Sequence, residues 1–146
     1  MDLIKTIDIA AGGMTAQRTR LNVISSNLAN ANTTRTEAGT PYRRKTVIFE
    51  ATPLEETFSG RLEQSLEDPI QTVKVKEIVP VEGEFRQIYD PSHPDADPKG
   101  YVYLPNVNLV QEMVQMLNAN RSYEANAAVI RTAKDMALKA LEIGGR

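Results

Sequence analysis

The residues best suited to chemistry gather in one loop, at positions 90–100. This loop holds the only histidine of the chain, His93, together with Asp90, Asp95 and Asp97. A cation site would need several oxygens converging on one point, and an EF-hand loop would need a terminal glutamate that is absent here. Catalysis by His93 would need a nucleophile beside it, and none is evident in the sequence. Aspartates among three prolines are typical of turns, so we interpret the loop as structural and predict no catalytic, cofactor-binding or metal-binding residues.

A basic triplet, Arg43, Arg44 and Lys45, is the second candidate site, with Tyr42 as its only neighbouring ring. A nucleic-acid surface would need a wider basic patch with several stacking rings. We therefore expect a solvated edge or a salt bridge to an acidic neighbouring subunit. The sequence also lacks a phosphate-binding glycine loop and the GxSxG and HExxH signatures. We expect no nucleic-acid partner and no small-molecule substrate.

Composition is that of one ordinary domain without cysteine chemistry. The chain has 146 residues, a net charge of −2, 5% aromatic residues and no cysteine. The small net charge disfavours a general nucleic-acid or acidic-membrane surface, and the lack of cysteine excludes disulfides and thiolate zinc sites. The N-terminus lacks a basic leader followed by an apolar run, and no stretch approaches the ~20 apolar residues of a membrane span. These tests alone predict a cytoplasmic protein.

The elements that must position these loops are two long terminal helices, each with an apolar seam of coiled-coil spacing. The first helix is expected over residues 3–31, and the second runs to about residue 143, where two glycines end it. We expect Asn106 or Asn108 to cap the second helix and Glu112 to favour its N-terminal dipole. The steps alternate between four and three residues at Leu3, Ile7, Ala10, Met14, Gln17, Leu21, Ile24, Leu28 and Ala31, and again at Leu109, Met113, Met116, Asn120, Tyr123, Ala127, Ile130, Lys134, Ala137 and Leu141.

Polar and small residues interrupt both helices in ways that leave two interpretations open. Gly12 and Gly13 cost about 1 kcal/mol each relative to alanine, so they either admit a close neighbour or break the helix in two. The run SSNLANANT at residues 25–33 is either a fraying end or a tightly packed polar surface that sets register. Asn120 and Lys134 on the second seam are expected to select register and partner number.

The middle of the chain loses the helical period. Strands are predicted at residues 43–50, 73–79, 85–89 and 100–104, and loops at residues 33–42 and across the acidic segment 52–69. So few and such short strands predict a hairpin or a small sheet. The fold class expected is mainly α with a small β-rich middle, its long terminal helices forming a coiled-coil layer in a helical assembly. Residues 1–34 and 105–146 together form the terminal-helix coiled-coil domain, and residues 35–104 form the inserted loops and short strands.

Because a simple pairing of the two ends would leave small-residue surfaces uncovered, we expect helices from other subunits to complete the packing. The leading hypothesis is a structural subunit of a helical assembly. A soluble coiled-coil adaptor or oligomerisation protein, and a small hydrolase using His93 with a nearby aspartate, are the alternatives. The assembly interface is predicted at Leu3, Ile7, Met14, Leu21, Ile24, Ser26, Asn27, Leu28, Asn30, Met113, Met116, Asn120, Tyr123, Ala127, Ile130 and Leu141. We also expect replacement of Met116 or Ile130 to matter more than replacement of Val114 or Leu117.

Several motifs resemble bacterial flagellar axial proteins of the rod and hook class. The N-terminal signature is AQRTRLNVISSNLANANT at residues 16–33, and the C-terminal one comprises PNVN at 105–108, EMV at 112–114, ANRSYEAN at 119–126 and TAK at 132–134. The segments GTPYRRK at 39–45, DPSHPDA at 90–96 and GYV at 100–102 are similar to proximal rod members of that class. The acidic stretch at residues 55–68 matches no motif of the class.

The resemblance implies a structural, non-enzymatic subunit without cofactors. It would polymerise through its terminal helices into the hollow drive shaft between the basal-body ring and the hook. The implied partners are other copies of itself, other flagellar rod proteins, the ring-junction protein FliE and the flagellar type III export apparatus. Export by that apparatus uses no cleaved signal peptide, so the resemblance implies a periplasmic basal-body protein, against the location predicted from the leader alone. It also implies loose ends in the free monomer.

Overall fold

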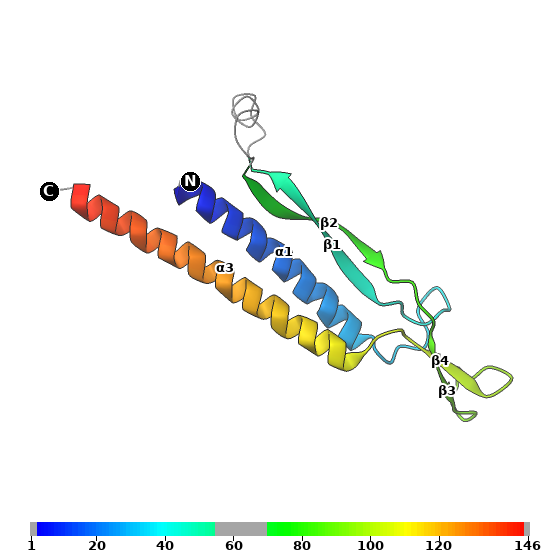
Figure 1. Cartoon of the computed structure of the whole chain (residues 1–146). Coiled ribbons are helices and arrows are strands. Elements are labelled where there is room, and N and C mark those ends of the chain that lie inside the picture. The colour runs from blue at the N-terminus through cyan, green and yellow to red at the C-terminus, as the bar shows by residue number, and fades with distance from the viewer. Residues whose placement is uncertain (1–2, 55–69, 145–146) are drawn as a thin grey trace.

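The computed structural model describes residues 3–54 and 70–144. Two long terminal helices lie side by side, and the chain between them forms two small antiparallel sheets (Figure 1). All six elements that the sequence predicts are present, so the mainly helical fold with a small β middle is confirmed. Their bounds are α1 at Leu3–Ala29, β1 at Lys45–Pro53, β2 at Gln71–Pro80, β3 at Arg86–Tyr89, β4 at Tyr101–Leu104 and α3 at Leu109–Gly144.

Helix α1 is the centre of the molecule. It packs against α3 on one side and against the β1–β2 hairpin on the other, whereas the β3–β4 hairpin projects beyond the helices (Figure 1). This projection lies at the end where α1 stops and α3 starts. With 27 residues in α1 and 36 in α3, the helices span about 40 and 54 Å at 1.5 Å per residue. The result is an elongated subunit rather than a globule.

The two helices run antiparallel and meet through small and polar residues. Asn27 contacts Glu112, and Gly13 lies against Asn126. These contacts are 14 residues apart on each helix, which is two heptads of coiled-coil spacing. The most deeply buried alanines, Ala16, Ala119 and Ala133, are 1–2% exposed. Small side chains let the helix axes approach closely.

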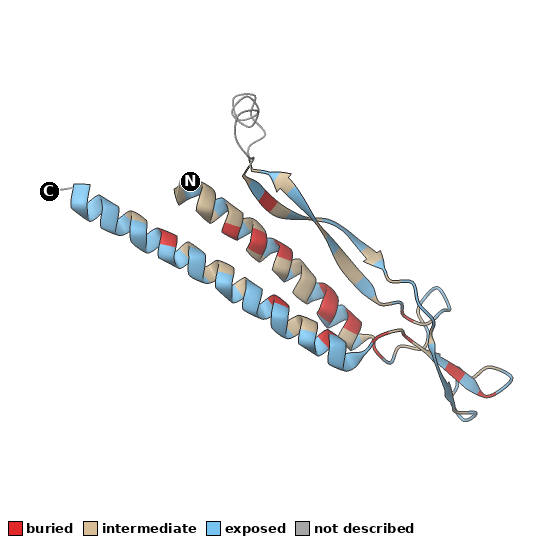
Figure 2. Cartoon of the chain, in the orientation of Figure 1, coloured by how far each residue is buried: buried red, intermediate tan, exposed pale blue. Residues whose placement is uncertain are grey.

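Half of the positions predicted for the seam of α3 do not face α1, so the prediction is wrong for those positions within the chain. The face toward α1 combines the buried Glu112, Ala119 and Ala133 with the half-buried Met116, Tyr123, Asn126, Ile130 and Ala137. Five predicted seam residues are half-buried: Met116, Tyr123, Ala127, Ile130 and Ala137. By contrast, Leu109, Met113, Asn120, Lys134 and Leu141 are exposed, and Figure 2 shows α3 as mostly exposed along its length. The seam shifts because the helix turns Glu112, Ala119 and Ala133 inward in place of their neighbours Met113, Asn120 and Lys134.

The glycine pair lies where α1 is enclosed on two sides. A Cβ on Gly12 would collide with the Thr72 hydroxyl and lie 3.3 Å from the carbonyl oxygen of Val73 in β2. A Cβ on Gly13 would lie 2.8 Å from Nδ2 of Asn126 in α3. The helix is continuous through both glycines, so the close-neighbour interpretation is confirmed and the break is wrong.

The helix ends follow local hydrogen bonding. Helix α1 ends at Ala29, two residues earlier than expected, and a turn continues through the bond from Asn30 N to Ser26 O. At the start of α3, Asn108 Oδ1 accepts the backbone N–H of Gln111 at 3.2 Å. Asn108 is therefore the N-cap, and α3 ends at Gly144, beside the predicted glycine signal.

Both sheets are two-stranded antiparallel ribbons. Strand β1 pairs with β2 from Lys45↔Pro80 to Pro53↔Gln71, with a bulge between Ile48 and Phe49. Because β1 runs to Pro53, the loop predicted from residue 52 is wrong at its first two residues. The rest of that prediction, including most of the acidic segment, falls on residues 55–69, outside the described residues. In the second ribbon the Tyr89 and Tyr101 rings meet edge to face with centroids 5.4 Å apart.

The crowding at Gly12 predicts that Gly12→Ala destabilises the fold. Alanine adds about 1 kcal/mol of helix propensity, but overpacking against β2 costs about 2 kcal/mol, so we expect a net loss of about 1 kcal/mol in urea unfolding. In a Thr72→Ala background, where the colliding hydroxyl is gone, the loss should shrink. Gly144→Ala, with no atom within 4 Å of its Cβ, is the control. An unfolding midpoint raised by Gly12→Ala would contradict the packing.

Candidate assembly interface

The side chain of Asn27 in α1 forms hydrogen bonds to the start of β1 and to α3, and it uses every donor and acceptor that it has. Its Oδ1 accepts hydrogen bonds from Lys45 N at 2.9 Å and from the Tyr42 hydroxyl at 3.0 Å. Its Nδ2 donates to Lys45 O at 2.8 Å and to Oε2 of Glu112 at 3.0 Å. Asn27 is 0% exposed. All four hydrogen-bonding sites of the amide are thus used.

Glu112 is the buried charge of this cluster, and Arg44 neutralises it. The carboxylate is 0% exposed, and its Oε1 accepts from Arg44 Nε at 2.7 Å. Arg44 also donates through Nη2 to Gln115 at 3.3 Å. A buried carboxylate needs such a partner, because desolvation without one is very costly. We call Asn27, Tyr42, Arg44 and Glu112 the buried node.

The buried node corrects the prediction for the basic triplet. Arg44 forms its salt bridge within the chain, not with a neighbouring subunit. The Arg43 guanidinium lies 4.8 Å from the centroid of the Phe85 ring, a cation–π distance. Arg43 and Lys45 are both exposed, as the expectation of a solvated edge had it.

The polar run at the end of α1 is packed rather than frayed. Ser26 Oγ lies 3.4 Å from the Tyr42 hydroxyl, and Asn30 Nδ2 donates to the carbonyl oxygen of Ser26 at 2.9 Å. Thr33 Oγ1 in turn donates to Asn30 Oδ1 at 3.2 Å. The packed interpretation is thus favoured over the frayed one, with partners in the same chain, and register setting between neighbouring subunits stays a prediction.

The predicted interface residues divide into covered and uncovered groups. In α1, Ile24 and Asn27 are buried, Ser26 is exposed, and the half-buried ones are Leu3, Ile7, Met14, Leu21, Leu28 and, just after the helix, Asn30. In α3, Met116, Tyr123, Ala127 and Ile130 are half-buried, whereas Met113, Asn120 and Leu141 are exposed. A contact between subunits at these positions stays a prediction.

Most of the exposed large apolar side chains on α3 gather near its two ends. Near the start lie Leu109, Val110, Met113, Val114 and Leu117, exposed by 44–71%; we call these five the head patch. Near the end lie Met136, Leu138, Leu141 and Ile143, exposed by 49–79%; we call these four the tail patch. Sequence reasoning assigned no role to Val110 and expected little of Val114 and Leu117. The sequence did contain a sign of these exposed residues, because α3 has more large apolar residues than a single seam can hold.

The loop at residues 90–100 uses its polar side chains in its own turns. Asp90 Oδ1 accepts from both Ser92 N and Ser92 Oγ, at 3.1 and 2.7 Å, and Asp97 Oδ1 accepts from the backbone N–H groups of Lys99 and Tyr101, both at 2.9 Å. His93 Nδ1 accepts from Asp95 N at 3.1 Å. The structural interpretation of this loop is confirmed. The side-chain hydrogen bond from Ser92, followed by its backbone bond, lowers the pKa of Asp90 below the ordinary value of 3.8.

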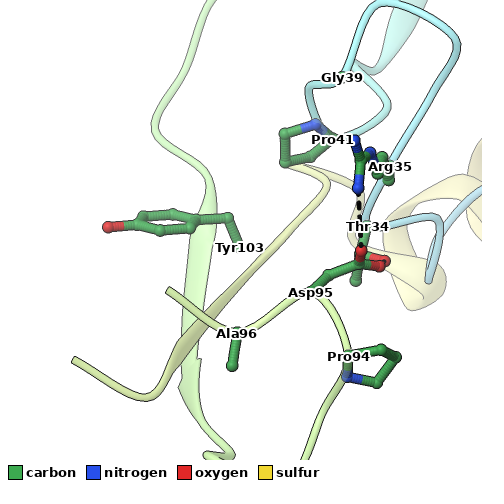
Figure 3. Close-up of a pocket in the computed structure, with 8 residues that line it drawn as sticks. All are labelled: Thr34, Arg35, Gly39, Pro41, Pro94, Asp95, Ala96 and Tyr103. Carbon is green, nitrogen blue, oxygen red and sulfur yellow. Dashed lines mark hydrogen bonds and ion pairs between the residues drawn. The ribbon is translucent and has the colours of Figure 1, made fainter. Parts of the chain in front are cut away.

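A hollow of about 290 Å³ lies between this loop and the loop that follows α1. In Figure 3, Asp95 points toward Arg35 from the opposite side, and the Tyr103 ring points away from both. The Arg35–Asp95 ion pair is 3.9 Å long, and Thr34 Oγ1 donates to Asp95 Oδ2 at 2.8 Å. The charged groups of the hollow thus compensate each other and tie the two loops together.

The described residues contain no group of three His, Cys, Asp or Glu side chains that could hold a metal ion. In the same residues no helix is long and apolar enough to span a membrane.

Two long terminal helices with large apolar residues left exposed describe an elongated subunit suited to assembly. A sequence profile described as flagella basal body rod protein matches residues 7–35, and one described as flagellar basal body rod FlgEFG protein C-terminal matches residues 99–143.

Relatives that are similar over nearly the whole chain are flagellar basal-body rod proteins FlgC. That of Borreliella burgdorferi is 46% identical over 98% of both chains. That of Aquifex aeolicus is 44% identical over 93% of this chain and 92% of its own, and that of Escherichia coli O6:H1 is 41% identical over 99% of both. The chain therefore belongs to the FlgC family of flagellar basal-body rod proteins, and the predicted role as a structural rod subunit is confirmed.

The four hydrogen bonds of Asn27 predict a large effect of Asn27→Ala. The substitution leaves Lys45, Tyr42 and Glu112 without this buried partner, so we expect a loss of about 3 kcal/mol in the free energy of unfolding. Urea unfolding followed by circular dichroism measures it. Asn22→Ala, at an exposed position of the same helix, is the matched control and should change stability by less than about 0.5 kcal/mol. Equal effects of the two substitutions would argue against the buried node.

The lowered pKa of Asp90 depends chiefly on Ser92, so Ser92→Ala should raise it toward 3.8. A carboxyl group whose pKa is lower in the folded state contributes stability above its unfolded pKa. That contribution should fade as the pH falls below 3.8 toward the folded value, and should be smaller in the variant. An NMR titration of the Asp90 carboxyl carbon gives the shift. Ser122→Ala, which removes a hydroxyl bonded within α3, should leave the titration unchanged.

Proposed function

We propose that this rod subunit polymerises through the outer faces of its terminal helices, which form the inner coiled-coil layer of a hollow shaft. The observation that carries the proposal is the uncovered apolar surface of α3, nine large side chains in the head and tail patches. Burying one such side chain contributes about 2 kcal/mol. A monomer leaves this free energy unused, and contact with other subunits would recover it.

A closed soluble adaptor fits the packing less well. Helices that close into a small soluble oligomer bury their large apolar residues in one shared seam. Here the seam within the chain buries Ala16, Ala119 and Ala133 and half-buries Met116, Tyr123 and Ile130, while nine other large apolar residues of α3 stay exposed near its two ends. The FlgC relatives also give the adaptor no support. His93 and the aspartates serve turns, which supports a subunit without catalytic activity.

The proposed partners are other copies of this chain, other flagellar rod proteins, the ring-junction protein FliE and the flagellar type III export apparatus. The proposed location is the periplasmic part of the basal body, reached without a cleaved signal peptide. Family membership supports the first two partners most directly, because the relatives are named as rod proteins. The predicted interface residues Met113, Asn120 and Leu141 are exposed and free to meet such partners.

Met113→Asp tests the proposal. Met113 is 59% exposed, so the variant should fold with an unchanged urea midpoint, yet a charge at an apolar contact should keep it out of the rod. The measurement is the amount of this chain in basal bodies purified from cells that carry only the variant, together with swimming. Asn118→Asp adds the same charge at an exposed polar position of α3 and should assemble. Wild-type chain missing from purified basal bodies would refute the function itself.

A further inference from the structure

The β3–β4 hairpin has no other helix or strand of the described chain packed against it, and it projects beyond the helices (Figure 1). We call residues 86–104, the two strands with the loop between them, the arm. Its side chains Ile88, Tyr89 and Tyr101 are 39–65% exposed, so burial between elements does not hold the arm in place. The direction of the arm relative to the helix pair therefore depends on the segments that attach it.

The segment that enters the arm is tied to the backbone of Arg44. Val81 N donates to the carbonyl oxygen of Arg44 at 2.7 Å. The side chain of Asn106 closes the same contact from the other end of the arm, because its Nδ2 donates to Val81 O at 3.0 Å and its Oδ1 accepts from Arg44 N at 2.9 Å. One amide thus joins the entry and the exit of the arm to a single residue of the chain.

The segment that leaves the arm is anchored on Tyr42. Val107 is 4% exposed and packs with Ala31 and Tyr42 in one apolar cluster. The hydroxyl of Tyr42 in turn donates to Asn27 Oδ1 at 3.0 Å. Both attachments of the arm therefore end on members of the buried node, Tyr42 and Arg44.

A further attachment runs through the loop of the arm and does not involve the buried node. Asp95 accepts from Thr34 Oγ1 at 2.8 Å and forms the 3.9 Å ion pair with Arg35. The Arg35 side chain is 71% exposed, and an exposed ion pair contributes little. The attachments through Tyr42 and Arg44 are therefore expected to dominate.

We propose that Arg44 couples the alignment of the helix pair to the direction of the arm. Its side chain neutralises Glu112 of α3 at 2.7 Å, while its backbone holds Val81 and Asn106. A shift of α3 that withdraws the Glu112 carboxylate leaves the Arg44 guanidinium without its buried partner, and the backbone that carries the arm is released with it. Such a contiguous chain of polar contacts is a physical route for coupling between distant parts of a protein.

The coupling makes the arm a reporter of the helix register. Aligned helices hold the arm in one direction, and helices out of register leave it free to swing about its attachments. Coupling is reciprocal, so fixing the arm also favours the aligned helices. The proposal concerns the single chain, and its failure would leave the polymerisation proposed above untouched.

Distances between two spin labels test the coupling on the full-length chain, which has no cysteine of its own. The labels are placed at Lys99→Cys in the arm and Asn22→Cys in α1, both at exposed positions. Glu112→Ala opens the buried node without touching the arm, and Asn106→Ala cuts the tie of the arm directly. Glu124→Ala, the same substitution at an exposed position of α3, is the matched control.

We expect a narrow distance distribution in the wild type and in Glu124→Ala, and a broad one in both Asn106→Ala and Glu112→Ala. A distribution in Glu112→Ala as narrow as that of the wild type would overturn the coupling, because the arm would then be held independently of the node.

If Glu112→Ala loses its helical circular dichroism, the reverse direction decides. Asn106→Ala should then speed hydrogen exchange of the Lys45 N–H, which donates to Asn27, by at least about fivefold. An unchanged exchange rate of that N–H would overturn the proposal.

Discussion

The buried carboxylate of Glu112 is the constraint on which the rest of the structure depends. A charge with no exposed surface is tolerated only when its partners are placed correctly, and here they come from two other elements. Arg44 lies at the start of β1, and Asn27 lies in the last turns of α1. Sliding α3 by one turn would separate the carboxylate from both partners, and sliding α1 would separate it from Asn27. The buried node therefore selects one register for the helix pair and also holds the first hairpin beside it.

The register has consequences far from the node. It brings Gly13 opposite Asn126, two heptads away, and places Gly12 against β2 on the adjacent side of α1. These are the places where a side chain would prevent close approach. The small residues of the seam contribute little apolar burial, so the specific polar contacts decide how the helices align. Stability and alignment thus come from different residues of the same interface.

Much of this architecture could be predicted from the sequence, because local patterns determine it. Helical periodicity identified both helices, β-branched alternation identified β1 and β2, and Asn108 was one of two expected caps. The seam of α3 was half wrong because periodicity favours the largest apolar residues, whereas the helix turned Glu112, Ala119 and Ala133 inward. The pairing of Arg44 with Glu112 spans 68 residues, and no local pattern reports such a contact. The motifs around residues 25–33 and 120–126 nevertheless identified the family, because they contain the polar residues that the packing requires.

Helix α3 consequently separates two tasks on two faces. The inner face is small and polar and needs exact alignment but little apolar area, so it can form within one chain. The rest of the helix surface holds exposed large residues such as Val110, Met113 and Ile143, whose exposure ranges from 59% to 79%, and it retains most of the apolar free energy that contact could release. Were these residues on the inner face, the monomer would be more stable and would have less to gain from association. A subunit that aligns itself with polar contacts and reserves its large side chains for other copies is suited to joining a growing structure.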